Sequence, residues 1–288
     1  MKVAALSLAG VPLENPAEYA AALAALLKQL QTGLAVLPAH TSFLLCAAQE
    51  QLVDAGDFAA SFRAFMQKAR AWNEVYLQMH CRLARENKLY LVPGTTIVEE
   101  GGRFFLAACL IDPGGRIIGW QRQTHLSREE RSFGLSRGEE LPLFDVEGMK
   151  AGLILGTDAR HPEVGRILAL QGAGLVIHCG AIATGPELAA QPAGIWAQVQ
   201  QNQFWAVEAQ LKGSMGGRTF GGRCAVLGPC EITPGQTGYL DRDAEGRPFA
   251  AAELREADRR RIKTDYPLLE LLRPEAYRGR LPELYGEV

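Results

Sequence analysis

The sequence has little net charge of either sign. Its 288 residues carry 30 lysines and arginines against 32 aspartates and glutamates, which gives a formal net charge of −2. Proteins that bind nucleic acid or an anionic membrane by electrostatic attraction carry a marked excess of basic residues. The densest basic run, Arg259-Arg260-Arg261, lies among acidic residues and is typical of a solvated helix face. The charge therefore predicts neither a nucleic acid nor a membrane as a partner.

The sequence also lacks paired cysteines and long apolar runs. Its six cysteines are scattered and include no C-x-x-C pair. A chain of this length needs no disulfides and shows no metal-binding spacing, so we expect reduced thiols and a cytoplasmic location. The N-terminal "MKVAALSLAGVPLENP" has a short alternating apolar run that ends at Pro12, which indicates a first strand and not a signal peptide. No apolar stretch reaches the length of a membrane span.

No linker divides the chain. Pro/Gly/Ser-rich stretches, shifts in composition and internal repeats are all absent, while 48% of the residues are apolar. α/β folds often reach this length as one domain. We therefore expect residues 1–288 to form a single domain.

Short apolar runs alternate with helical segments along the chain. The run of apolar residues at three-to-four spacing between Asp57 and Glu86 predicts one long helix with a core-facing stripe, not a cofactor-binding motif, and we expect no cofactor. Further helices are predicted from Asn15 and Pro16 to residue 30, and over 162–171 and 192–203. The turn "DPGGR" predicts a hairpin. The predicted strands cover 2–8, 33–39, 88–94, 104–112, 116–122, 151–156, 174–180, 204–209 and 222–229. Hairpins together with crossovers predict an α/β sandwich with mixed sheets.

Three predicted strands end in polar or special residues. They end in Pro38-Ala39-His40, Gly156-Thr157-Asp158 and His178-Cys179-Gly180. Ligands of open α/β sheets bind outside the carboxyl ends of the strands. A site is therefore expected where these three strand ends meet.

Six segments in order carry a resemblance to a known family. They are "GLAVLPAHT", "IDPGGRIIGWQRQTHL", "GLILGTDARHPEVGRILALQGAGLVI", "WAQVQQNQFWAV", "FGGRCAVLGP" and "LLRPEAYRGRL". Together they resemble the nitrilase superfamily of carbon–nitrogen hydrolases along nearly the full chain. The resemblance implies a four-layer α-β-β-α sandwich with two six-stranded-like mixed sheets. It also implies a homodimer, with a C-terminal tail (about 264–288) that contacts the partner subunit.

The resemblance also implies that the family's catalytic residues are missing. The family attacks an amide or nitrile carbon with a cysteine thiolate, uses a glutamate as general base and stabilises the oxyanion with a lysine. The corresponding positions here are Ala39 for the glutamate, Gln123 for the lysine and Gly156 for the cysteine. Gln123 is consistent with this loss, because a lysine without its acidic partners would be an unpaired interior charge.

Other residues near these positions keep the family's pattern. By resemblance, Asp158, Arg160 and Glu163 brace the turn, and His125 follows the lost lysine by two residues. The family's aromatic residue in the same turn is replaced by His161, and its Arg-Ala-x-Glu-Asn becomes "QVQQN". A second pocket glutamate of the family corresponds to Glu130, with a register that leaves Glu129 and Arg131 open.

Two kinds of replacement for the lost chemistry are open, a nucleophile at another position and a metal site. Cys179 ends a strand and is a candidate nucleophile that faces the pocket, with His178 on the opposite face by strand alternation; the alternative is a buried small hydrophobic residue. Thr157 follows the vacant position, but a threonine without an adjacent base is a poor nucleophile.

A metal site is the other replacement. His40, Asp158, His161 and His178 lie near strand ends and would bind a zinc-like ion if they converged, although their local spacing does not support a metal site.

Two functions therefore remain. The favoured hypothesis is a non-catalytic member of the superfamily, acting as a structural or regulatory subunit or as a binder of a small amide- or carboxylate-like ligand. The alternative is an amidase-like hydrolase of amides, nitriles or N-carbamoyl compounds with a rearranged site. Whether the protein is an enzyme stays open at this point.

Overall fold

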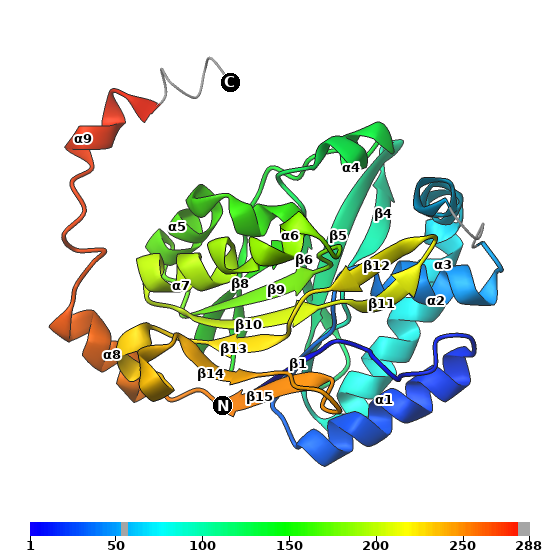
Figure 1. Cartoon of the computed structure of the whole chain (residues 1–288), viewed down its shortest axis with the longest axis horizontal. Helices are drawn as coiled ribbons and strands as arrows, with labels where there is room; N and C mark the ends of the chain where they lie inside the picture. The colour runs from blue at the N-terminus through cyan, green and yellow to red at the C-terminus, as the bar shows by residue number, and fades with distance from the viewer. Residues whose placement is uncertain (53–56, 282–288) are drawn as a thin grey trace.

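Two β-sheets lie face to face between two layers of helices (Figure 1). The structure is a computed structural model and describes residues 1–52 and 57–281. The first sheet has the strand order β15-β1-β2-β3-β5-β4, with β6 paired to β5, and the second has the order β14-β13-β10-β9-β8-β7. Both sheets are mixed: β1 pairs in parallel with β2 and antiparallel with β15. The predicted four-layer α-β-β-α sandwich is confirmed.

The strands of the first sheet alternate between two apolar layers. In β1, Val3 and Ala5 face the second sheet, while Ala4 and Leu6 face the helices. Because both faces are covered, such strands are apolar throughout. The strands are β1 (Lys2–Leu6), β2 (Leu34–Val36), β3 (Tyr90–Val92), β4 (Thr96–Glu100), β5 (Arg103–Ile111), β6 (Ile117–Arg122) and β15 (Phe249–Glu253).

The second sheet contains the turn from which the site is built. Its central strands β8, β9 and β10 run parallel, so their carboxyl ends lie at one edge. The strands are β7 (Leu143–Val146), β8 (Met149–Leu155), β9 (Leu175–Gly180), β10 (Trp205–Gln210), β13 (Ala225–Leu227) and β14 (Tyr239–Arg242).

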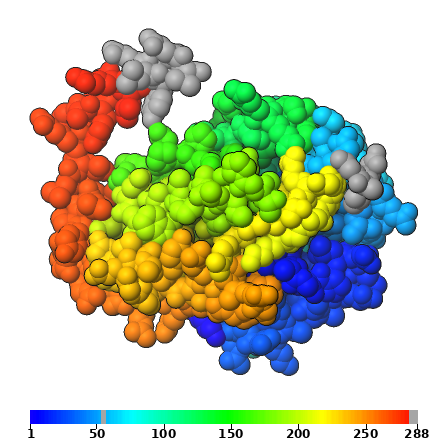
Figure 2. Space-filling model, in the orientation of Figure 1, coloured from blue at the N-terminus to red at the C-terminus, as the bar shows by residue number. Residues whose placement is uncertain are grey.

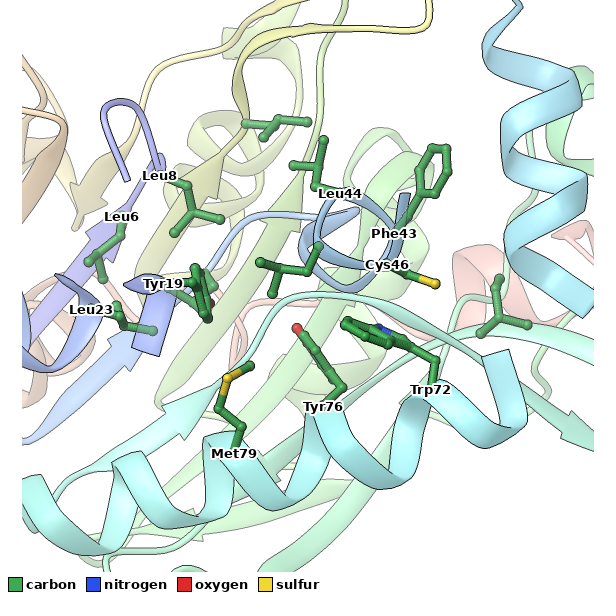
Figure 3. Close-up of a cluster of buried hydrophobic side chains, with 14 of the residues drawn as sticks. Leu6, Leu8, Tyr19, Leu23, Phe43, Leu44, Cys46, Trp72, Tyr76 and Met79 are labelled. Carbon is green, nitrogen blue, oxygen red and sulfur yellow. The ribbon is translucent and has the colours of Figure 1, made fainter. Parts of the chain in front are cut away.

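Helices cover the outer face of each sheet. The first sheet packs against α1 (Pro16–Leu30), α2 (Thr41–Gln49) and α3 (Phe58–Asn87). Figure 3 shows the core between them, where Tyr19 of α1, Phe43 of α2 and Tyr76 of α3 lie among other apolar side chains. The second sheet packs against α5 (Pro162–Leu170) and α7 (Ile195–Asn202). The apolar stripe predicted for the long helix is therefore core, as expected.

Shorter elements border the carboxyl edge of the second sheet. They include α4 (Arg128–Ser132), the 3-10 helix η1 (Gly156–Arg160), α6 (Pro186–Ala189) and the hairpin of β11 (Lys212–Met215) and β12 (Arg218–Gly221). The remaining short helical turns are η2 (Gln191–Ala193), η3 (Cys230–Ile232) and η4 (Pro234–Gln236).

The chain after β15 leaves the sandwich. Helix α8 (Glu256–Asp265) is followed by an extended segment and α9 (Glu275–Arg278), which lies away from the sheets in Figure 1. The predicted tail begins near residue 264, and its last part, 282–288, lies outside the described residues. Among the described residues, no helix combines the length and the apolar character that a membrane crossing requires.

The structure corrects the sequence prediction in some places. The first sheet has seven strands among the described residues, not six. The sequence did not predict α2, β4, β7, β14, β15 or the β11–β12 hairpin, whereas the helix face expected around Arg259-Arg260-Arg261 is α8. The predicted hairpin at "DPGGR" is present as β5–β6, where the Asp112 carboxylate accepts hydrogen bonds from the backbone N–H groups of Gly114 and Arg116, at 2.9 Å each.

Candidate functional site

A cavity of about 520 Å³ lies at the carboxyl edge of the second sheet. Its apolar wall includes four phenylalanines: Phe58 and Phe62 of α3, Phe220 of β12, and Phe133 directly after α4. The polar residues that line the cavity are His40, Ser127, Arg128, Glu129, Glu130, Thr157, Arg160, His178, Glu187, Gln191, Glu208 and Arg218. The structure thus has a cavity at the strand ends, where the sequence predicted a site.

Ala39, Gln123 and Gly156 meet at the floor of this cavity. Ala39 and Gly156 both line the cavity, and Ala39 N–H donates to the carbonyl of Gly180 at the end of β9 (3.2 Å), which ties the two sheets together. Gln123 follows β6 and is fully buried. A Cβ placed on Gly156 would lie 3.2 Å from Gln123 Oε1. Three positions that are distant in sequence are therefore neighbours here.

The backbone conformation at position 156 favours glycine. Its φ is +49°, in the left-handed region that glycine adopts at low cost. The residue joins β8 to η1 and so changes the chain direction at the cavity floor. The turn leaves the space above Gly156 open to the cavity.

Helix α4 brings Glu130 to the same floor. Ser127 and Glu130 form a capping box, in which Ser127 Oγ accepts from Glu130 N–H (3.1 Å) and Glu130 Oε2 accepts from Ser127 N–H (2.6 Å). Glu130 also accepts from Gln123 Nε2, at 3.1 Å to Oε2. Burial raises the pKa of Glu130 above its ordinary value. Of the two neighbouring glutamates, Glu130 contacts Gln123, whereas Glu129 contacts Arg218.

Glu129 pairs with Arg218 of the β11–β12 hairpin. The guanidinium donates to both carboxylate oxygens, at 2.7 and 2.6 Å, and lies 4.1 Å above the ring of Phe58. The hydrogen bonds from Arg218 hold the pKa of Glu129 below its ordinary value. This ion pair connects α4 to the hairpin beside the cavity.

His178 and Glu208 form a buried pair at the ends of β9 and β10. His178 Nδ1 lies 3.2 Å from Glu208 Oε1, and His178 Nε2 lies 3.4 Å from the carbonyl oxygen of Gly156. Gln210 Nε2 donates to the same Glu208 oxygen (2.8 Å). Both members of the pair line the cavity.

The expected orientation of Cys179 is wrong. Leu175, Ile177 and Cys179 all face the space between the two sheets, so alternation puts His178 on the face that reaches the cavity. Cys179 is fully buried, and burial raises the pKa of its thiol well above the ordinary value. It is a small core residue.

Asp158 braces the turn from behind the cavity. Its buried carboxylate accepts from Thr124 N–H (3.1 Å), Thr124 Oγ1 (2.8 Å) and His125 N–H (2.6 Å). His125 stacks on His161 with ring centroids 3.8 Å apart. Burial and the neighbouring His125 lower the pKa of His161. Asp158, His125 and His161 do not line the cavity. Their contacts with one another hold the turn in place.

His40 lies at the rim of the cavity within an aromatic cluster. Its ring centroid is 5.8 Å from Phe58, 5.7 Å from Phe62 and 6.2 Å from Phe220. Burial lowers its pKa to about 4, and its Nδ1 is buried without a hydrogen-bond partner. The ring is neutral near pH 7.

The other predicted residues have separate contacts. The hydroxyl of Thr157 donates to the carbonyl of His125. Arg160 reaches the carbonyl oxygen of Glu187 (3.3 Å). His40, Asp158, His161 and His178 do not form a group suited to a metal ion, and no such cluster of three occurs among the residues described.

Several residues of the site were not predicted from the sequence. They are Phe58, Phe62, Phe133, Glu208, Arg218 and Phe220. The spacing of Ser127 and Glu130 is a capping-box signature and could have located α4. Nothing local in the sequence marks Arg218 or Glu208, because their partners are distant in sequence.

The fold and the site have counterparts among known proteins. The family model for carbon–nitrogen hydrolases matches residues 5–233, and the chain belongs to this family. An omega-amidase, NIT2-B of Xenopus laevis, is 30% identical over 115 residues, which cover 36% of this chain and 42% of that protein. A nitrilase of Pyrococcus abyssi is 29% identical over 147 residues, which cover 51% of this chain and 54% of that protein. The match thus spans less than two thirds of either relative.

A solved structure matches over more of the chain. The amidase of Nesterenkonia sp. AN1, with the acetamide moiety of fluoroacetamide added covalently at its active-site cysteine, has a TM-score of 0.74 and 20% sequence identity. The match covers 97% of this chain and 96% of that one. At this identity the likeness establishes the shared fold.

Proposed function

We propose that this member of the carbon–nitrogen hydrolase family binds a small ligand in its cavity and does not hydrolyse amides or nitriles by the family's cysteine mechanism. The observation that carries the proposal is the chemistry at the cavity floor, where Ala39, Gln123 and Gly156 meet. By resemblance, these are the positions of the family's glutamate, lysine and cysteine.

None of the three side chains can take over the corresponding role. Gly156 has no atom that could attack a carbonyl carbon, and Ala39 cannot accept a proton. Gln123 carries no positive charge, and its N–H groups already donate to protein acceptors. Cys179 is no substitute, because its thiol is buried in the core and its raised pKa keeps it protonated.

A hydrolytic function is the second candidate, and the similarity to an omega-amidase and to a nitrilase favours it. In this chain it requires a group other than residue 156. Glu130 lines the cavity and has a raised pKa, which is the property of a general base that activates water.

A turnover assay separates the two candidates. We expect the purified protein to release no ammonia or acid from primary amides, nitriles or N-carbamoyl compounds above a heat-denatured control. The Gly156→Cys variant is expected to remain inactive, because single members of a catalytic group contribute little without their partners. Turnover that survives Cys179→Ser and disappears in Glu130→Gln would overturn the proposal and establish the hydrolytic candidate.

We also propose that the protein is a homodimer in which the C-terminal tail contacts the partner subunit. The described part of the tail exposes large apolar side chains, with Leu271 at 74%, Tyr266 at 56% and Tyr277 at 47% exposure. In Figure 2 this segment lies along the outside of the molecule. Light scattering is expected to give twice the chain mass, and a lower mass after removal of residues 266–288; a monomer at micromolar concentration contradicts the proposal.

A cytoplasmic location is proposed on the state of the cysteines. All six are free thiols, and burial is the first cause of the raised pKa of each of them. Free thiols persist in a reducing compartment.

A further inference from the structure

The orientation of the Gln123 amide is determined by its neighbours. Its Nε2 lies 2.8 Å from the His125 carbonyl oxygen, 2.7 Å from Thr157 Oγ1 and 3.1 Å from a Glu130 oxygen. The Thr157 hydroxyl donates to the same His125 carbonyl, so it accepts from Gln123. A reversed amide would place its oxygen against a carbonyl and a carboxylate. The NH₂ group therefore points to these three acceptors.

The Gln123 amide lies beside Gly156, and a Gly156 Cβ would lie 3.2 Å from its Oε1 and 3.4 Å from its Nε2. Gln123 Oε1 is buried and has no hydrogen-bond partner in the protein. Gly156 lines the cavity. A buried acceptor without a donor is unfavourable, because it has lost its hydrogen bonds to water. A ligand that donates a hydrogen bond from the space above Gly156 compensates for this loss.

The Glu130 carboxylate faces the same space from α4. It lines the cavity and accepts from Ser127 N–H and Gln123 Nε2, which leaves further lone pairs on its two oxygens. His178 Nε2, another polar atom at the floor, lies 3.4 Å from the carbonyl oxygen of Gly156. The floor therefore offers acceptors and negative charge, which favours a ligand rich in donors.

Three arginines line the cavity, Arg128, Arg160 and Arg218, against four glutamates, so its lining carries one more acidic than basic side chain. The Arg218 guanidinium is neutralised by two hydrogen bonds to Glu129. Arg160 donates to the carbonyl of Glu187. Above the floor, the wall of Phe58, Phe62, Phe133 and Phe220 offers an aromatic surface. A flat apolar body fits this wall, since aromatic rings pack favourably against one another.

We propose that the cavity binds a compound with a flat apolar body and a protonated nitrogen head group, whose N–H groups donate to Gln123 Oε1 and to the Glu130 carboxylate above Gly156. This inference rests on the binding role proposed for the cavity. It replaces the small amide- or carboxylate-like ligand expected from the sequence with an amidine or an amine. Charge-assisted hydrogen bonds to a buried carboxylate are about twice as strong as neutral ones.

Three ring compounds of matched size test the head group. Calorimetry at pH 7.5 with benzamidine, benzamide and benzoate is expected to give at least a tenfold tighter dissociation constant for benzamidine than for benzamide, and no detectable binding of benzoate. Equal affinity for benzamide and benzamidine, or tighter binding of benzoate, overturns the inference. Binding is measured without turnover, so amide hydrolysis would defeat the proposed function and leave this inference standing.

Two variants and a control test the residues. Gln123→Met removes the unpaired acceptor at similar size, and Glu130→Gln removes the charge while keeping the capping box. Each is expected to weaken benzamidine binding at least tenfold. The control is Glu74→Gln, because Glu74 is an exposed glutamate of α3 that does not line the cavity; the affinity of this variant is expected to stay within twofold. A loss in the control equal to that in Glu130→Gln contradicts a specific contact.

A third variant covers the case in which Gln123→Met fails to fold. Gly156→Ala leaves both partners in place and fills the space above the floor. It is expected to reduce benzamidine binding at least tenfold while Gln123 and Glu130 are unchanged. Retained affinity in this variant overturns the placement of the head group.

Discussion

The turn that contains Gly156 and Asp158 has buried polar groups on both of its sides, but on one side a buried acceptor has no hydrogen-bond partner. On the far side, the Asp158 carboxylate is fully buried and accepts hydrogen bonds from Thr124 and His125. On the cavity side, the equally buried Gln123 Oε1 has no partner. Buried polar groups in folded proteins are nearly always paired, so an exception calls for a reason. The difference teaches that the hydrogen bonds of Asp158 hold the turn in place, whereas Gln123 keeps an acceptor that no donor of the protein uses.

The largest effect is expected from removing the Asp158 carboxylate. Asp158→Ala leaves buried N–H and O–H donors of Thr124 and His125 unpaired, and we expect it to lower the free energy of unfolding by about 3 kcal/mol. Urea denaturation measures the change. Gln123→Met is the matched variant on the cavity side, and its loss is expected to be smaller, because removal of the unpaired acceptor offsets part of the cost of the lost Nε2 hydrogen bonds. An equal loss in the free energy of unfolding of the two variants would contradict this difference between the two sides of the turn.

An intermediate effect is expected at Gly156. Gly156→Ala places a Cβ at a φ of +49°, which costs about 1–2 kcal/mol for a residue other than glycine. The new Cβ also lies within 3.2 Å of Gln123 Oε1. Thermal unfolding measures the loss. A variant as stable as the original protein would show that the turn does not require glycine.

A smaller effect is expected from a buried histidine far from the cavity. His80 is fully partnered, with Nε2 2.9 Å from the Tyr19 hydroxyl and Nδ1 2.8 Å from the Tyr76 carbonyl oxygen, whereas Nδ1 of His40 has no partner. Burial lowers the pKa of His80 to about 4. A histidine of lowered pKa stabilises the fold only while it is neutral, so this contribution is lost as the pH falls from about 6.5 to about 4.

Denaturation at pH 7.5 and pH 5.5 measures the His80 effect. We expect the free energy of unfolding to fall by about 1 kcal/mol more in the original protein than in His80→Gln over this interval. An identical pH dependence of the two proteins would show that His80 does not titrate in this range.

Most of the fold was accessible from the sequence, because its signals are local and repeated. The long stripe of α3 has helical spacing, and "DPGGR" is a strong hairpin signal. The β11–β12 hairpin was missed although its turn, Gly216-Gly217, has positive φ at both residues, as a tight hairpin requires. The Ala-rich β15 has the composition of a helix, and its pairing with β1 overrides that preference.

The site was accessible only in part. Strand-end reasoning located the cavity with Ala39 and Gly156 in its lining, and the resemblance to the family pointed to Gln123, which lies beside Gly156. Alternation established that His178 and Cys179 lie on opposite faces of β9, but it cannot tell which face is outside. That choice depends on the packing of Leu175 and Ile177 between the sheets, which is a tertiary property. The unpaired Gln123 oxygen likewise results from three contacts that no sequence pattern specifies.

The pairing of β1 with β15 has a consequence for biosynthesis. Lys2 lies opposite Glu253, so the partner of the first strand is made only after the strands of the second sheet. Contacts between residues so far apart in sequence slow folding. Until residues 249–253 have left the ribosome, one edge of β1 presents open N–H and C=O groups that can pair with another nascent chain. During most of its translation the chain thus has an unpaired edge on β1, and this edge becomes paired once β15 has been synthesised.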